Sequence, residues 1–116
     1  MSHAVTARDV IAGTMTEAEL LENVRACAVQ FGWLFYHTRD SRGSAPGFPD
    51  VVLARAPRCG APDRVLLLAE LKTMRGQLSP AQAMWRDALR QCPLACTYAL
   101  WRPTHWLDGT IEQALR

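Results

Sequence analysis

GFPDVVLA at residues 47–54 and VLLLAELK at residues 65–72 are the two stretches that decide the fold. Both contain apolar runs of strand length, and the segment between them carries prolines and a glycine, which favour a turn. An antiparallel hairpin with a central turn brings Asp50 level with Glu70. Side chains alternate between faces along a strand, so Glu70 and Lys72 share one face. The hairpin therefore predicts two carboxylates and one ammonium group at one end.

Charged groups at the end of an apolar strand need a partner, because an unpaired buried carboxylate is costly. A salt bridge from Lys72 to Asp50 or Glu70 is one solution. A divalent metal ion bound by the two carboxylates is the other. These three residues by themselves support both interpretations equally.

Composition limits the class of protein. The chain has 116 residues, of which 49% are hydrophobic, and this predicts one domain over residues 1–116 with its core at about 16–101. The formal net charge of +2 excludes a broadly basic protein that coats DNA. The cysteines lack the spacing of a zinc site, and no signal peptide or membrane-spanning stretch is apparent. We therefore expect a cytoplasmic protein without a membrane partner.

A helix is predicted to begin after Thr16. Thr16 is a suitable N-cap, Glu19 completes a capping box, and Gly32 ends the apolar periodicity. The helical wheel puts Glu17 on the buried face and Glu22 more to the side. An acidic residue in a first turn either compensates the helix dipole or belongs to a site, and the first of these is the commoner.

An aromatic strand is predicted at residues 33–37, followed by a polar loop. This segment brings His37, Arg39 and Arg42 close before Asp50 in the sequence. Arginine side chains and backbone N–H groups in such a loop are suited to hold a phosphate. An ordinary solvated connection explains the same residues, and for His37 it does so equally well.

The second half of the chain predicts a helix and a strand. Ser79 and Pro80 mark the start of a helix that runs to about Gln91, and Gln82 and Arg86 share its polar face next to the carboxylates. Five residues form the expected inner face: Leu78, Met84, Trp85, Ala88 and Leu89.

The remaining segments complete the fold class. Residues 1–15 are expected to be irregular or partly helical, residues 95–101 form a strand, and residues 104–116 form one or two short helical turns. The order of elements predicts an α/β protein with a mixed central β-sheet flanked by helices, in the order α-β-β-β-α-β with a short C-terminal helix.

The combined pattern resembles the VRR-NUC family of the PD-(D/E)xK nuclease superfamily. It consists of a glutamate on the first helix, GFPD ending at Asp50, the hairpin, ELK at residues 70–72, and GQLSPAQ at residues 76–82 before a helix. The likeness extends over residues 16–101. It implies a restriction-endonuclease-like core of the stand-alone type found in phages and bacteria.

The resemblance also implies roles for individual residues. Asp50 and Glu70 match the catalytic carboxylates that bind metal, the Leu71 carbonyl is a further expected ligand, and Lys72 matches the catalytic lysine. The helix glutamate maps to Glu17, with Glu22 as the alternative. Oxygen ligands of this kind suit Mg²⁺, with Mn²⁺ as a second possibility, and no small-molecule cofactor is implied.

DNA is the implied partner. The residues expected to contact it are His37, Arg39, Arg42, Arg75 and Gln82. The activity expected from the resemblance is metal-dependent endonucleolytic cleavage of DNA, selective for Holliday junctions or other branched structures. A non-catalytic DNA-binding or phage assembly module is the alternative, and a sequence-specific restriction-type nuclease is a third interpretation.

A homodimer is expected, because cutting both strands of a junction symmetrically requires two sites related by a two-fold axis. Trp101, Trp106 and the aromatic residues near Phe35 are the candidates for its apolar interface.

Overall fold

Four strands form one mixed sheet in a computed structural model that describes residues 4–38, 43–57 and 66–116. The strands are, in sheet order, β1 (Leu34–His37), β2 (Val51–Ala54), β3 (Leu66–Leu71) and β4 (Thr97–Trp101). β1, β2 and β3 pair antiparallel, and β4 runs parallel to β3. The predicted α/β fold class with a mixed sheet is confirmed.

The register between β2 and β3 agrees with the predicted hairpin. Val51 pairs with Ala69 and Val52 with Leu68. One further step along this register sets Asp50 opposite Glu70. The two carboxylates therefore meet at the end of β2 and β3 that lies away from the hairpin turn.

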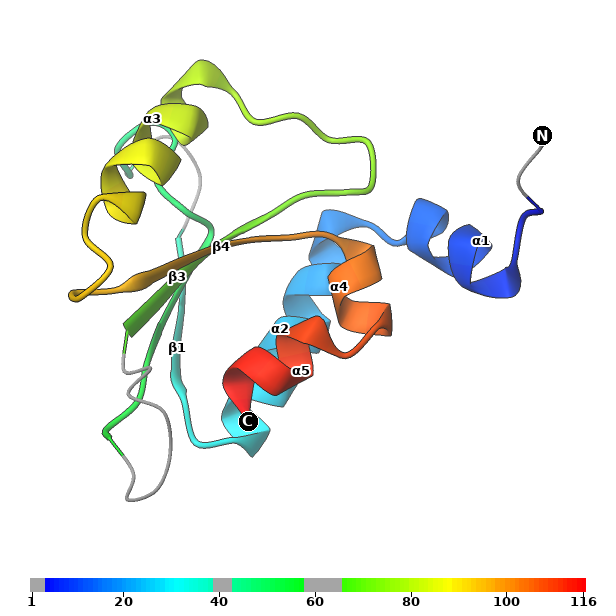
Figure 1. Ribbon diagram of the computed structural model, residues 1–116, viewed down its shortest axis with the longest axis horizontal. Coiled ribbons are helices and arrows are strands. Elements are labelled where there is room, and N and C mark those ends of the chain that lie inside the picture. Colours follow the sequence, from blue (N-terminus) through cyan, green and yellow to red (C-terminus); the bar gives the residue numbers. More distant parts are fainter. Residues whose placement is uncertain (1–3, 39–42, 58–65) are drawn as a thin grey trace.

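Helices cover both faces of the sheet (Figure 1). α2 (Glu17–Gln30) and α5 (Thr110–Leu115) pack on one face and enclose the main core with α4 (Pro103–Leu107). α3 (Pro80–Arg90) lies on the other side (Figure 1). The two short C-terminal helices confirm the prediction for this segment. No helix in the described part of the chain has the length and apolar character needed to cross a membrane.

α2 begins as predicted. The Thr16 hydroxyl accepts a hydrogen bond from the Glu19 backbone N–H at 3.1 Å, and the Glu19 carboxylate accepts one from the Thr16 N–H at 3.1 Å. Leu20 and Val24 are completely buried. Glu17, however, is exposed, so its predicted place on the buried face is wrong. It is the first residue of the helix, and its side chain stands at the rim of the core, before the first buried residue.

The N-terminal segment is more regular than expected. Residues 1–15 were predicted to be irregular or partly helical, but α1 (Ala7–Thr14) is a regular helix. Thr6 and Asp9 form a capping box, in which Asp9 replaces the usual glutamate or glutamine. Only Ala12 of this helix is buried, so most of α1 lies on the surface of the protein.

α3 starts as predicted at Ser79 and Pro80, but its inner face is different. Met84 is 72% exposed and Ala88 is also exposed, so their predicted burial is wrong. Gln82 instead turns toward the sheet, where its amide reaches a buried acid. Because the polar Gln82 occupies a sheet-facing position, the spacing of the apolar residues along α3 indicated the wrong inner face.

A tight contact joins α3 to the loop before Asp50. Gly47 has φ +81°, and a Cβ atom built on it would lie 2.4 Å from the Ala81 carbonyl carbon. Phe48 packs edge-on against Trp85 with ring centroids 5.0 Å apart, and Trp85 Nε1 donates to the Pro46 carbonyl at 3.1 Å. α3 therefore fixes the loop that carries the first carboxylate.

Replacing Gly47 by alanine should destabilise the protein by about 2 to 4 kcal/mol. The left-handed backbone and the collision with backbone atoms of α3 both oppose a side chain here. Thermal or urea unfolding measures the effect. Gly43→Ala is the matched control, since a Cβ there meets nothing within 4 Å. Equal stability of the two variants would contradict this role.

Candidate active site

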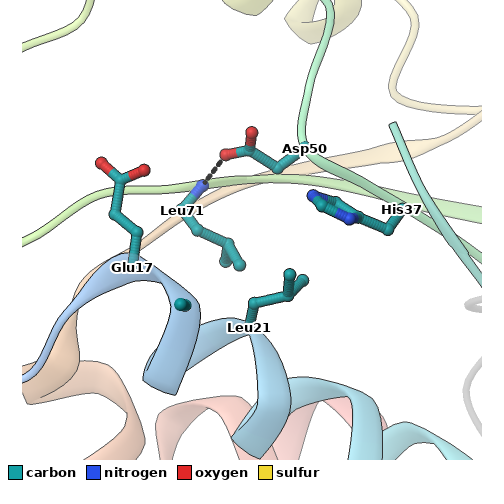
Figure 2. Close-up of a pocket in the computed structure, with 6 residues that line it drawn as sticks. Glu17, Leu21, His37, Asp50 and Leu71 are labelled. Carbon is teal, nitrogen blue, oxygen red and sulfur yellow. Dashed lines mark hydrogen bonds between the residues drawn. The ribbon is translucent and has the colours of Figure 1, made fainter. Parts of the chain in front are cut away.

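Asp50 lies at a bend between Pro49 and the start of β2. Its carbonyl accepts a hydrogen bond from the Thr38 N–H at 2.8 Å, which continues the β1–β2 pairing by one residue. Its side chain turns to β3, where Oδ2 accepts the Leu71 N–H at 2.8 Å (Figure 2). Thr38 thus holds the Asp50 backbone, and the Leu71 N–H holds its carboxylate.

Glu70 is a buried acid, with only 2% of its surface exposed. Gln82 Nε2 donates to its Oε1 at 2.9 Å. Burial raises the pKa of Glu70 to about 8, with further contributions from a hydrogen bond to Asp50 and from the Asp50 charge, while the Lys72 charge acts in the opposite direction. At neutral pH this carboxyl group therefore favours its protonated form, mainly because it is buried.

A pocket of about 220 Å³ lies beside Asp50, and Gln82 is not among the residues that line it. Six residues line it: Glu17, Ala18, Leu21, His37, Asp50 and Leu71. Figure 2 shows the carboxylates of Glu17 and Asp50 on the same side of Leu71, and the His37 ring extending into the space between Asp50 and Leu21. The end of the sheet and the start of α2 therefore bring two acids and an imidazole to one cavity.

The alternative helix glutamate lies elsewhere. Glu22 accepts a hydrogen bond from Arg25 Nε at 2.9 Å, and this contact lowers the pKa of Glu22. It does not line the pocket that Glu17 and Asp50 share. The geometry thus sets Glu17, and not Glu22, beside the strand carboxylates.

The other predicted site residues lie at different distances from the carboxylates. Lys72 is half-buried, and its charge acts on Glu70. Arg75 is exposed and lines a neighbouring groove instead of the pocket. Arg39 and Arg42, expected to contact DNA, lie outside the described residues. Gln82 borders Glu70, as the sequence suggested, with both ends of its amide engaged.

The family assignment follows from a sequence comparison. The VRR-NUC domain model matches residues 3–100, which is most of the chain. The chain belongs to the VRR-NUC family. Members of this family are nuclease-related, so DNA is the partner of this VRR-NUC domain, and nucleases of this kind generally need a divalent metal. No curated protein and no solved structure matches the chain.

The donor set of this VRR-NUC site fits a hard cation in its chemistry. The Asp50 carboxylate and the buried Glu70 carboxyl group interact at the end of β2 and β3, and a bound cation neutralises two such acids when both are ionised. Glu17 adds a third carboxylate across the pocket. Within the described ranges, no three Asp, Glu, His or Cys side chains are already gathered as a ligand cluster.

Sequence reasoning missed one residue that shapes this site. Arg102 Nη1 donates to the carbonyls of Thr73 and Gly76, both at 2.7 Å, and so holds the turn that follows Lys72. This turn also packs against the Lys72 side chain: a Cβ atom built on Gly76 would lie 3.3 Å from the lysine Cδ. The only sequence signal was an arginine before a proline at the end of a strand, which is too common to be specific.

Proposed function

We propose that this VRR-NUC chain is an endonuclease that hydrolyses phosphodiester bonds in DNA with Mg²⁺ or Mn²⁺. The observation that carries the proposal is the meeting of Asp50 and Glu70 at the end of β2 and β3, where burial first and the neighbouring Asp50 second raise the pKa of Glu70. A structural carboxylate pair of this kind, with no cation partner, would only cost stability.

The chain's own residues have separate roles in this proposal. Asp50 and Glu70 hold the ion together with the Leu71 carbonyl, and Glu17 faces it from α2. A bound divalent ion supplies charge to polarise the scissile phosphate and lowers the pKa of a bound water molecule. Lys72 faces the phosphate and orients the attacking water as a fixed positive charge.

The remaining residues serve the substrate. His37, Arg39, Arg42 and Arg75 contact the sugar-phosphate backbone, which positions DNA without reading its sequence. Gln82 is close enough to border the DNA, but its amide is occupied by Glu70 and by the Ser79 N–H, so we assign it to positioning Glu70.

The finer description follows the sequence-based expectation. We propose selectivity for Holliday junctions or other branched DNA, action as a homodimer, and a setting in the cytoplasm of a bacterium or of a phage-infected cell. Trp101 is only 4% exposed and so is unavailable for the dimer interface that the sequence suggested, whereas Leu34 and Tyr36 on β1 are exposed. Light scattering that finds only monomers at working concentrations would remove the dimer.

The decisive experiment is a substrate panel. Purified protein is incubated with junction, flap, single-stranded and plain duplex DNA in Mg²⁺, Mn²⁺ or chelator. We expect cleavage of branched DNA that chelator abolishes. Binding that is the same in metal and in chelator, without cleavage, would favour the rival DNA-binding or phage assembly module.

Replacing Glu17 by glutamine should lower cleavage about 10- to 100-fold, because the neutral amide is a weaker ligand in the same place. The matched control is Glu22→Gln, which changes an acid on the same helix that pairs with Arg25 outside the pocket. Cleavage rates at saturating Mg²⁺ distinguish the two. Loss of activity in the control alone would assign the role to Glu22.

A further inference from the structure

A second groove lies next to the site and shares Glu17 with its pocket. It has a volume of about 500 Å³, within the range of about 300 to 1,000 Å³ that is typical of ligand sites. One wall is formed by the end of α1 and the start of α2, and the other by residues 73–75 after β3. The groove and the pocket that Asp50 lines therefore adjoin each other at Glu17.

The lining of the groove suits a nucleobase better than a phosphate. Met15 and Met74 supply soft apolar surface from the two walls. Thr73 also lines the groove, and its hydroxyl oxygen accepts the Gly76 N–H at 3.1 Å. Glu17 repels a phosphate from the interior. Arg75 lies at an exposed position of the lining, and among the described residues its guanidinium has no ion-pair partner.

The wall that carries Met74 and Arg75 is held in place before any ligand binds. Arg102 bonds the Thr73 and Gly76 carbonyls, and the Lys72 N–H donates to the Trp101 carbonyl at 3.0 Å. This wall of the groove is therefore preformed, and it begins at the residue after the proposed catalytic lysine. Preorganisation of this kind lowers the entropic cost of binding.

We propose that this groove receives one unpaired nucleotide next to the scissile phosphate, with its base between Met15 and Met74 and a phosphate at Arg75. The inference rests on the proposed nuclease function and deepens it by naming the substrate class. A paired base is stacked and bonded to its complement, so only a base that has left the duplex can enter a concave groove. DNA with an unpaired nucleotide at the cut therefore becomes the preferred substrate.

Gly13→Phe tests the groove by filling it. Gly13 lines the groove, has no positive φ, and would place a Cβ atom in open space, so the added ring fits without backbone strain. Val10→Phe is the matched control, because Val10 is 54% exposed on the same helix and does not line the groove. Met74→Ala is a second variant that removes one apolar wall.

Binding is measured by fluorescence anisotropy in chelator, where cleavage cannot interfere. The probes are a thymidine oligonucleotide and an abasic oligonucleotide of equal length, which differ only in their bases. The wild type and Val10→Phe should prefer thymidine about three- to tenfold, as sulfur–ring contacts allow, and Gly13→Phe and Met74→Ala should lose most of that preference. Unchanged preference in both groove variants, or no preference in the wild type, would overturn the inference.

The two proposals can fail separately. A wild-type protein that shows the base preference but cuts no DNA in Mg²⁺ or Mn²⁺ would contradict the nuclease function and support the groove. A protein that cuts DNA but does not distinguish the two probes would do the reverse. Thermal unfolding of Gly13→Phe and Met74→Ala verifies that both variants are folded.

Discussion

Replacing Asp50 by alanine should abolish metal-dependent DNA cleavage and leave the protein folded. The same result is expected for Glu70→Ala. Each change removes one of two carboxylates that meet at the end of β2 and β3, and a rate loss of at least about 1,000-fold corresponds to the several kcal/mol that a bound metal contributes to the transition state. Rates are measured on branched DNA over a range of Mg²⁺ concentrations.

Folding and binding must be preserved for this result to bear on catalysis. Removal of the Asp50 carboxylate leaves the Leu71 N–H without its acceptor. It also removes the repulsion between Asp50 and Glu70. Circular dichroism and DNA binding in chelator should therefore be close to those of the wild type. Asp87→Ala is the matched control, since this acid on α3 is 65% exposed. Mg²⁺-dependent cleavage retained by either site variant would refute the proposed function.

Replacing Glu70 by glutamine should stabilise the metal-free protein at pH 8. The native pKa of Glu70 is raised from its ordinary value of 4.5 to about 8, mainly by burial and by its contact with Asp50. Between these values the folded protein holds a proton that the unfolded chain has released, so stability falls as pH rises through this window. Glutamine mimics the protonated acid and needs no proton.

The magnitude has an upper limit of about 5 kcal/mol, which follows from the displacement between the two pKa values. Hydration of the neighbouring pocket reduces this, and we expect about 1 to 3 kcal/mol at pH 8 and no stabilisation below pH 4.5. Denaturant unfolding in chelator between pH 4 and about 9 measures the difference. A glutamine variant whose stability relative to wild type does not change with pH would show that Glu70 titrates normally.

The affinity for a divalent metal should depend on pH over the same range. A cation that binds Asp50 and Glu70 displaces the proton of Glu70, so metal affinity should rise with pH up to about 8. The wild type should accordingly be stabilised by Mg²⁺ or Mn²⁺ at pH 8, and Glu70→Gln should not respond.

The comparison with the sequence shows which features local patterns encode. Alternation of apolar residues, turn formers and capping boxes act over a few residues, and they predicted β2, β3 and the starts of α2 and α3. The hairpin register followed from the same signals, so the meeting of Asp50 and Glu70 was accessible from sequence. The residue pattern that resembles the VRR-NUC family was accessible for the same reason.

Other features depend on contacts between distant segments. Helical periodicity put Glu17 on the buried face of its helix, although it is exposed and lines a pocket that residues of β1 and β3 complete. It also misassigned the inner face of α3, because the residue that faces the sheet is the polar Gln82, whose partner Glu70 lies on another element. Neither outcome can be derived from the spacing of residues within one helix.

By itself, the sequence determined the strands, the hairpin and the pairing of two carboxylates, since hydrogen bonding and side-chain alternation between neighbouring strands are set by local order. Only the tertiary structure decided that Glu17 and not Glu22 lies beside Asp50, that Gly47 leaves room for α3, and that Arg102 holds the wall of the second groove. The physical reason is that these contacts join segments at least 26 residues apart in the chain. Such contacts are determined by close packing in the folded protein and not by local propensity.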